Sequence, residues 1–556
     1  MSIAIRVRRQ PYLIWLLPLL LYVALGIPAA WMQRELINPD AIAYIRLSRY
    51  LLAGDWHHAF SGYWSPLYPC LMAPLIATGM DGLLAAHLTL ALCGGLFVWM
   101  AHRLLRQFED TIPPLTRLWM LLVTACVAVH LMARIVSPDL LMGAVLMGYL
   151  ATAARSSVLV RPRQAFRAGV LGGMTYLAKA YALPFFLVQF PVTLLMHALA
   201  LRRARVAGAG IGRSVPARRL LVACAAGLLG FSTLAGPWIG LLSHRYGRLT
   251  MATAGPINHN EAARAPAEVK YRPTFFVPPD PYITEAELLD QRVTRFWSPL
   301  ESWQRLRQQW EVMRDNVPQI VRALAKFDGV GLVPIALVIG LISAPLVLRG
   351  GAVEWRSAWL AMTIAIYCAG FTAVYFEPRL IEAALWCPAF LLCVLLMRRA
   401  VGLLAGRGER VARGAKAGLP CLVFATYTVT AVAGGLWAWR RPVHDRLFRD
   451  VAASMRSAGL RGPIACSSRG IGAYVAYFLD AKLITIPATD SPEEYERDCR
   501  RGAVQCLLIN RSAPSGTTPS DPTSSAQLVA TGPGWVKRLE LANSRAHIDV
   551  YSRARP

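Results

Sequence analysis

The sequence predicts a polytopic α-helical membrane protein with a small C-terminal α/β domain. Of its 556 residues, 55% are hydrophobic and only 16% are charged, whereas soluble domains carry about 25% charged residues. Eleven apolar runs come close to the ~20 residues that a helix needs to cross the hydrocarbon core, and none of them lies after residue 439. This composition excludes a disordered chain and a small disulfide scaffold.

The eleven apolar runs are the predicted transmembrane helices. Pro and Gly occur inside several of them, which membrane helices tolerate. The first run is long and has no small-residue cleavage site, so we expect a retained anchor rather than a signal peptide. The predicted spans are Tyr12–Met32, Leu83–Leu104, Leu118–Ala133, Leu140–Ala154, Ala165–Leu177, Leu183–Leu201, Leu220–Ser243, Gly331–Leu348, Ala358–Tyr375, Ile381–Met397 and Leu419–Trp439.

Basic residues are concentrated on one side of this predicted membrane. Six segments on that side hold 24 basic and four acidic residues, and so account for 20 of the 27 net positive charges. Because loops rich in Lys and Arg stay in the cytoplasm, this side is predicted to be cytoplasmic. The alternation predicts an odd number of spans, with the N-terminus inside and the C-terminus outside. Membrane topology therefore explains most of the net positive charge. This charge gives no support for a nucleic-acid partner.

The predicted topology divides the chain into a membrane domain, 1–439, and a soluble extracytoplasmic domain, 440–556. The membrane domain has two long outer loops, 33–82 and 244–328. The soluble domain alternates short apolar runs with helical patterns, which predicts a small open α/β sheet. Its predicted strands are Pro463–Cys466, Lys482–Ile486 and Ala503–Ile509, and its predicted helices are Gly472–Leu479 and Pro492–Arg501.

Three local signals refine the soluble domain. Ser491 with Glu494 three residues later predicts a capping box at the start of the second helix. Ser512–Ser525 is rich in Ser, Pro and Thr, which predicts a flexible loop. Gly470-x-Gly472 follows a predicted strand but lacks the third glycine of a dinucleotide site, so we expect an ordinary turn there.

The 11 cysteines show no metal-ligand spacing. Seven lie in predicted spans, where Cys behaves as a small apolar residue. Cys70, Cys466, Cys499 and Cys506 are predicted to face the oxidising side. A disulfide among the last three is left open, since nothing in the sequence fixes a pairing.

Four ionisable residues lie at the outer ends of predicted spans, in four different segments: Asp40, Asp139, Lys179 and Arg379. Such groups are costly beside the bilayer unless they face a cavity or a partner. The alternative is that each is a solvated loop end or a helix cap, and Asp139 in particular suits a cap. For the four together, we predict a shared polar cavity at the outer membrane surface.

Asp40 is predicted to begin an amphipathic helix that ends near Gly54. Ile42, Ile45 and Leu52 are expected to enter the membrane interface, as the apolar face of an interfacial helix does. Such a helix would hold the Asp40 carboxylate just above the bilayer.

The first outer loop also carries a family resemblance. Pro39-Asp40, then Tyr44, Leu51 and Gly54-Asp55-Trp56, and then Trp64-Ser65-Pro66-Leu67-Tyr68-Pro69, resemble the first periplasmic loop of GT-C superfamily glycosyltransferases. The similar members are bacterial and include lipid A aminoarabinose transferase and protein O-mannosyltransferase-like enzymes. Weaker matches follow in order at Ser137-Pro138-Asp139, Tyr176–Lys179, Pro237-Trp238, Tyr246–Arg248 and Arg379.

This resemblance implies an inverting glycosyltransferase of the bacterial cytoplasmic membrane. It would move a sugar from a polyprenyl-phosphate donor to an envelope lipid, glycan or protein on the outer side. Asp40 matches the catalytic aspartate that accepts a proton from the acceptor hydroxyl or orients it, and Asp139 would be a second carboxylate. The leaving phosphate would be stabilised by cations.

The implied roles cover further residues. Donor phosphate binding would fall to Lys179 and Arg379, with weaker candidates in the fourth outer loop: Arg245, Arg248, Lys270 and Arg272. Substrate contacts would come from Tyr44, Asp55, Trp64 and Tyr68.

A required metal is not expected, although a divalent ion is left open. Many relatives have an acidic pair at the first-loop site, whereas here Ala41 follows Asp40. His57 and His58, beside Asp55, could bind a divalent ion, but solvated loop residues are the simpler interpretation.

Two other classes of function remain as alternatives. One is a secondary transporter, although such proteins usually show two repeated halves with midplane sites, and no repeat is visible. The other is a non-catalytic subunit of envelope glycan assembly.

Overall fold

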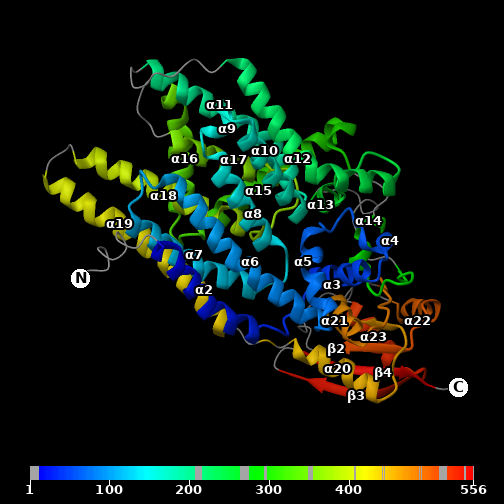
Figure 1. Cartoon of the computed structure of the whole chain (residues 1–556). Helices are drawn as coiled ribbons and strands as arrows, with labels where there is room; N and C mark the ends of the chain where they lie inside the picture. The colour runs from blue at the N-terminus through cyan, green and yellow to red at the C-terminus, as the bar shows by residue number, and fades with distance from the viewer. Residues whose placement is uncertain are drawn as a thin grey trace.

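A helical bundle forms most of the chain in the computed structural model (Figure 1). The structure describes residues 12–206, 216–262, 275–292, 297–348, 355–405, 409–440, 443, 445–487, 489, 491–511, 522–543 and 546–554. Each predicted span coincides with a helix. These helices are α2 (Leu13–Met32), α6 (Gly82–Leu105), α7 (Pro114–Arg134), α8 (Asp139–Ala153), α10 (Pro162–Ala178), α11 (Ala182–Val206), α12 (Ala217–Tyr246), α16 (Leu332–Leu348), α17 (Trp355–Thr372), α18 (Arg379–Ala405) and α19 (Glu409–Arg440).

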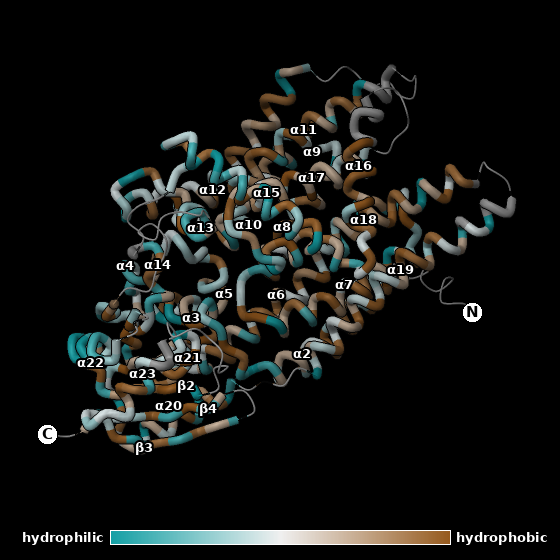
Figure 2. The backbone as a smooth tube through the Cα atoms, turned by 180° about the vertical axis from the view of Figure 1, so that it is seen from behind, coloured by the Kyte–Doolittle hydropathy of each residue, from teal (hydrophilic) through white to brown (hydrophobic). Residues whose placement is uncertain are grey.

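Seven of these helices are long and apolar enough to cross a membrane, within the part of the chain that the structure describes: α2, α6, α7, α11, α12, α18 and α19. Two more, α8 and α16, contain shorter apolar stretches. Figure 2 shows the hydrophobic colour concentrated in this bundle. The polytopic helical class is therefore confirmed, whereas the count of eleven spans and their orientation stay predictions.

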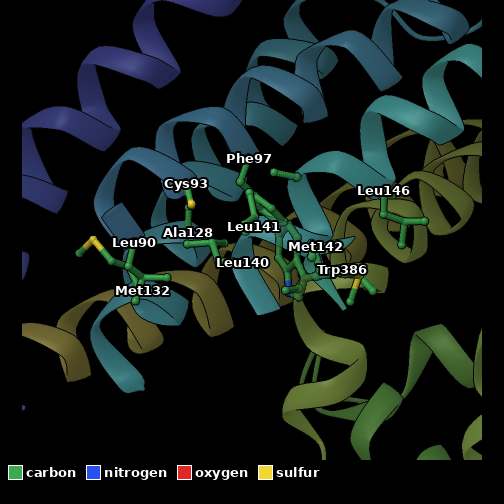
Figure 3. Packing of buried hydrophobic residues seen from close by; sticks show 14 of the residues in the cluster. Leu90, Cys93, Phe97, Ala128, Met132, Leu140, Leu141, Met142, Leu146 and Trp386 are labelled. Atoms are coloured by element: carbon green, nitrogen blue, oxygen red, sulfur yellow. The ribbon is translucent and has the colours of Figure 1, made fainter. Parts of the chain in front are cut away.

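Helix α8 lies in the middle of the bundle. All of its residues except Thr152 are buried, as expected for a helix that is apolar on every side. Figure 3 shows Leu140, Leu141 and Leu146 of α8 among side chains of α6, α7 and α18. This packing fixes the position of Asp139, the first residue of α8.

The first outer loop folds into α3 (Pro39–Leu52), α4 (Trp56–Ala59) and α5 (Leu67–Ala77). The prediction that α3 lies in the membrane interface is wrong, because Ile42 and Ile45 are fully buried and only Leu52 is exposed. Helix α5 and part of the C-terminal tail pack against α3. The sequence pattern did not show that protein, rather than lipid, covers this apolar face.

An exposed apolar stripe occurs instead in the second long outer loop. This loop contains α13 (Ala254–Ala262), η2 (Glu285–Leu288), α14 (Leu289–Arg292), η3 (Pro299–Glu301) and α15 (Trp303–Ala325). Trp303, Leu306, Trp310, Val317 and Val321 of α15 are exposed and share one helix face. A stripe with two tryptophans suits a membrane interface.

The C-terminal tail forms a small mixed sheet with helices, which confirms the predicted α/β class. Its elements are α20 (Arg446–Ser457), β1 (Ile464–Cys466), α21 (Arg469–Leu479), α22 (Pro492–Arg501), β2 (Cys506–Asn510), α23 (Pro522–Ala530), β3 (Trp535–Ala542) and β4 (His547–Arg553). The strand order is β1-β2-β4-β3, with β1 and β2 parallel and β4 antiparallel to both of its neighbours. The hydrophilic helix α22 lies at this end of the molecule (Figure 2).

Several tail predictions need correction. The predicted strand Lys482–Ile486 is present only as isolated bridges of Leu483 and Thr485, and the β3–β4 hairpin was not predicted. Gly470-x-Gly472 lies inside α21 rather than in a turn. The end of the predicted loop Ser512–Ser525 belongs to α23, while 512–521 lie outside the described residues.

The predicted capping box is formed only in part. The Ser491 hydroxyl accepts a hydrogen bond from the Glu494 N–H at 3.2 Å. The Glu494 carboxylate accepts instead from the Thr489 hydroxyl at 2.7 Å. All 11 cysteines are free thiols, so the disulfide that the sequence left open among Cys466, Cys499 and Cys506 is not formed.

The tail is held against the outer ends of the bundle by polar contacts. Asp445 accepts a hydrogen bond from the Ile37 N–H at 3.0 Å. Arg449 pairs with Glu35 at 3.0 Å and with Asp81 at 3.6 Å. Figure 1 shows α20 and α21 beside α3 and the end of α2. These contacts place the tail next to the first outer loop.

Candidate active site

The structure brings Asp40, Asp139, Lys179 and Arg379 together around one cavity of about 480 Å³, which we call the membrane cavity. Asp40 lies in the first turn of α3, and Asp139 is the first residue of α8. Lys179 follows the last residue of α10, and Arg379 begins α18. Residues separated by up to 339 positions therefore share one site.

Two ion pairs join these four residues. Arg379 Nη1 donates to Asp40 Oδ2 at 2.8 Å, and Lys179 Nζ donates to Asp139 Oδ1. The Ser137 hydroxyl also donates to Asp139 at 2.8 Å. Because each partly buried carboxylate has a cationic partner, neither leaves an uncompensated charge.

Helix ends favour three of the four charges at these positions. The positive end of a helix dipole stabilises an acid in the first turn, where Asp40 and Asp139 lie. The negative end stabilises a cation after the last turn, where Lys179 lies. Arg379 is at the positive end of α18, where a cation is disfavoured, and its contacts with two carboxylates offset this cost.

Glu377 is the second carboxylate that contacts Arg379, at 2.5 Å from its Nε, and it was not among the predicted site residues. Burial alone would raise the pKa of Glu377, but the hydrogen bond from Tyr375 at 2.6 Å and the charge of Arg379 hold that pKa below its ordinary value. Glu377 is therefore charged at neutral pH. The signal that could have found it is its place in the same short outer turn as Arg379.

Aromatic side chains line the rest of the membrane cavity. Tyr44 and Trp64, two of the predicted substrate-contact residues, line it with their rings 5.1 Å apart. Burial and the negative charges of Asp40 and Asp139 raise the pKa of Tyr44 well above its ordinary value. Tyr176, from the weaker match Tyr176–Lys179, is also part of this wall. Its other aromatic residues, Tyr63, Tyr181, Phe371 and Tyr375, were not predicted.

Helix α15 holds one wall of the cavity in place. Its buried Asn316 amide donates to the carbonyl oxygens of Thr372 at 3.0 Å and Val374 at 2.7 Å. Gln309 donates to the carbonyl oxygen of Ala373 at 2.9 Å. Since this segment leads directly to Glu377 and Arg379, α15 supports the position of both charged side chains.

The other predicted site residues do not line the membrane cavity. Asp55 accepts hydrogen bonds from the backbone of His58 and lies 2.6 Å from its Nδ1, so it caps α4. Tyr68 is fully buried and donates to the Ala86 carbonyl oxygen at 2.8 Å.

The two predicted arginines of the fourth outer loop also lie outside the cavity lining. Arg245 donates to the His57 carbonyl oxygen, and Arg248 follows the end of α12. The weaker candidates Lys270 and Arg272 lie outside the described residues.

Within the described residues, the group with metal-ligand spacing is Glu540, His547 and Asp549 in the β3–β4 hairpin. Lys537 Nζ lies 2.5 Å from Glu540 and 2.9 Å from Asp549, and Arg511 also pairs with Asp549. This group is therefore an ion-pair network of the tail and does not contribute to the membrane cavity.

Comparison with known proteins gives similarities of structure. No model of a known protein family matches the chain, and no curated protein matches its sequence. The solved structures that are similar include ArnT from Cupriavidus metallidurans bound to undecaprenyl phosphate, with 14% identity over 96% of this chain and 97% of that chain and a TM-score of 0.46. The archaeal oligosaccharyltransferase AglB from Archaeoglobus fulgidus, in complex with an inhibitory peptide and a dolichol-phosphate, has 12% identity over 91% of this chain and 70% of that chain and a TM-score of 0.49. The arabinofuranosyltransferase AftD from Mycobacteria has 11% identity over 96% of this chain and 40% of that chain and a TM-score of 0.38.

The chemistry available to the membrane cavity follows from its own residues. Carboxylates can accept a proton, and Lys179 and Arg379 can stabilise an anion that forms in the cavity. Phe371 and Tyr181, whose rings are stacked at 3.9 Å, provide apolar surface on the same wall. The cavity thus combines carboxylates, two cationic side chains and an apolar wall.

Proposed function

We propose that this chain is an inverting glycosyltransferase that uses a polyprenyl-phosphate-linked sugar on the outer side of the bacterial cytoplasmic membrane. The observation that carries the proposal is the Asp40–Arg379 pair in a cavity that also holds Lys179. A lipid phosphate is an anionic leaving group, so the reaction needs cations near the phosphate and a base near the acceptor. Lys179 and Arg379 would be the cations and Asp40 the base, and all three line the same cavity.

Donor binding would rearrange the ion pair. In the structure, the charge of Arg379 is shared by Asp40 and Glu377. A donor phosphate beside Arg379 and Lys179 competes for these cations, because arginine binds phosphate with two parallel hydrogen bonds. Asp40 is then released from its partner and is available to the acceptor.

The transfer step follows from these positions. Asp40 takes the proton of an acceptor hydroxyl while that oxygen attacks the anomeric carbon. The bond between the anomeric carbon and the phosphate oxygen breaks, and its electron pair goes to the phosphate, which Arg379 and Lys179 stabilise. The attack comes from the face opposite to the leaving group, so the configuration inverts.

The remaining groups position the substrates. Lys179 and Ser137 hold Asp139 in one orientation, and its carboxylate can accept hydrogen bonds from sugar hydroxyls. Tyr44 and Trp64 offer aromatic surface to a sugar ring. Tyr181 and Phe371 offer apolar contact to the first prenyl units.

The test is transfer by the purified full-length protein in lipid nanodiscs. A panel of polyprenyl-phosphate sugars is incubated with envelope lipids, polysaccharides and proteins, and the products are identified by mass spectrometry. Asp40→Asn should abolish transfer, because an amide cannot accept the proton. Asp55→Asn is the matched control, since it changes the same residue type in the same loop outside the cavity, and it should retain most activity.

Full activity of Asp40→Asn would contradict the assignment of Asp40 as the base. Two other outcomes would favour the alternative functions. Substrate flux into proteoliposomes without transfer would favour a secondary transporter. Binding of the lipid-linked sugar without any turnover would favour a non-catalytic subunit.

A further inference from the structure

A second cavity, of about 380 Å³, lies between the membrane part and the tail, and we call it the tail cavity. One side of it is formed by the chain between α2 and α3 and by the end of α7. The other side is formed by α20, α21 and two residues next to β3 and β4, Asn543 and Ala546. Among its lining residues are Asn38, Arg134, Asp445, Phe448, Tyr474 and Asn543.

The tail cavity and the membrane cavity lie on two sides of the same short segments. Asn38 lines the tail cavity, and Asp40, two residues later, lines the membrane cavity. A narrow pocket of about 10 Å³ is lined by residues from both cavities. It shares Arg134 with the tail cavity, and it shares Asp139 and Arg379 with the membrane cavity. Such a volume holds about one water molecule, so in this state the pocket is closed to any larger group.

Tyr474 of α21 lines the tail cavity, and its ring packs against that of Phe448. Burial, together with the negative charges of Asp445 and Asp40, raises the pKa of the Tyr474 hydroxyl to about 12, so this hydroxyl stays protonated and can donate a hydrogen bond.

The lining of the tail cavity has the chemistry that sugars need. The Phe448 and Tyr474 rings lie 5.1 Å apart and offer aromatic surface for the C–H faces of a sugar ring. Asn38, Asn543 and Asp445 already bond to the protein backbone, and an amide or carboxylate oxygen can accept a further hydrogen bond, here from a sugar hydroxyl. Arg134 is paired with Glu382 at 2.5 Å, so the cavity has no strong net charge that would favour a phosphate.

We propose that the tail cavity binds a glycan acceptor and directs one of its hydroxyls to Asp40. This inference rests on the proposed function and adds the class of acceptor. Inversion requires the acceptor oxygen and the leaving phosphate to lie on opposite faces of the anomeric carbon. A donor phosphate beside Lys179 in the membrane cavity and a glycan beside Tyr474 in the tail cavity would approach the sugar from different directions, as this geometry requires. Movement of Arg379 toward the phosphate would enlarge the narrow pocket between the two cavities, because Arg379 lines that pocket.

The test measures binding and does not need turnover. The full-length protein in nanodiscs is examined by saturation-transfer NMR with a panel of methyl glycosides of common envelope sugars. Ile471 lines the tail cavity, and Ile471→Trp fills it. Leu528→Trp is the matched control, because Leu528 is an exposed apolar residue of α23 in the same tail.

We expect at least one glycoside to give a signal with the wild type and with Leu528→Trp. Ile471→Trp should reduce that signal about tenfold, and Tyr474→Ala should weaken it as well. Binding of undecaprenyl phosphate, measured on the same samples, should stay within about twofold in all variants, which also shows that Ile471→Trp is folded.

Two binding results would overturn the inference. One is the absence of a signal from every glycoside with the wild type, and the other is an unchanged signal in Ile471→Trp. Transfer to a peptide acceptor by the wild type, with equal rates in Ile471→Trp, would likewise reject a glycan in the tail cavity while leaving the glycosyltransferase intact. Failure of the proposed function itself would appear separately, as loss of undecaprenyl phosphate binding or of all transfer.

Discussion

Asn38 holds the backbone of Val136 through both ends of its side-chain amide. Its Nδ2 donates to the Val136 carbonyl oxygen at 3.2 Å, and its Oδ1 accepts from the Val136 N–H at 3.1 Å. Asn38 precedes α3 but makes no side-chain cap to it, although asparagine is a favoured cap. The amide is used instead to join the two segments that carry Asp40 and Asp139.

Asn38→Ala should therefore lower turnover without removing any catalytic group. Loss of both hydrogen bonds frees the two segments to move apart, and a displacement of about 1 Å can cost about 100-fold in rate. We expect kcat to fall by about 10- to 100-fold while the affinity for undecaprenyl phosphate changes little. Asn38→Asp should not restore kcat, because its second oxygen would face the Val136 carbonyl. An unchanged kcat in Asn38→Ala would contradict this positioning role.

Arg379→Lys should be a poor substitute for arginine. The guanidinium contacts Asp40 and Glu377 with different nitrogens, and a lysine ammonium is a single point charge that cannot reproduce this fork. We expect transfer to fall by about 100-fold or more, in line with the loss of one oxyanion-stabilising donor. Arg248→Lys, outside the cavity lining, is the control, and both variants are compared by initial rates in nanodiscs. Equal rates for the two would remove Arg379 from the proposed anion site.

Glu377→Gln should alter how stability depends on pH. The pKa of Glu377 is lower in the folded chain than in the unfolded chain, so the carboxylate contributes stability above its unfolded pKa of about 4.3. That contribution is lost as the pH falls through the lowered folded value. Thermal unfolding followed from pH 7 to pH 3 should show a smaller loss in Glu377→Gln than in the wild type. Parallel curves would mean that the contacts of Glu377 with Arg379 and Tyr375 do not contribute.

Two glycines of α21 make a matched pair for the packing of the tail. A Cβ on Gly472 would lie 2.7 Å from the Cys466 Cβ and 2.9 Å from the Leu483 Cδ1, so Gly472→Ala should destabilise the sheet by about 1–3 kcal/mol. A Cβ on Gly470 meets no atom closer than 3.8 Å, and Gly470→Ala should be neutral or slightly stabilising, because alanine favours helix. Hydrogen exchange of β1 and β2 in the full-length protein measures both effects. Similar exchange in the two variants would contradict the close contact of α21 with β1.

The sequence predicts best what depends on local composition. Each apolar run coincides with a helix, because hydropathy over some twenty residues decides whether a segment suits the membrane. Asp40, Asp139, Lys179 and Arg379 could be grouped since topology alone places helix ends on one side. Contacts between distant segments leave no pattern in the sequence, so most of the aromatic wall was missed. Glu377 was also missed, although it lies only two residues before Arg379.

The errors have physical causes of the same kind. Ile42 and Ile45 have the pattern of an interfacial helix, but α5 and the tail cover them. Strand β3 was missed because most of its residues after Trp535 are exposed or only partly buried, so the apolar alternation is weak. Lys482–Ile486 looked like a full strand, yet it meets its neighbours only at Leu483 and Thr485.

The Asp40–Arg379 pair has a consequence for how the donor is protected from hydrolysis. A lipid-linked sugar is an activated compound, and a base left free beside it would turn water into a competing nucleophile. In the mechanism that we propose, Asp40 is the base, and in the structure it is bound to Arg379, the cation that the donor phosphate would claim. Activation of the acceptor would then wait for the donor, so the donor would bind first. Until then, the ion pair would keep Asp40 from activating water.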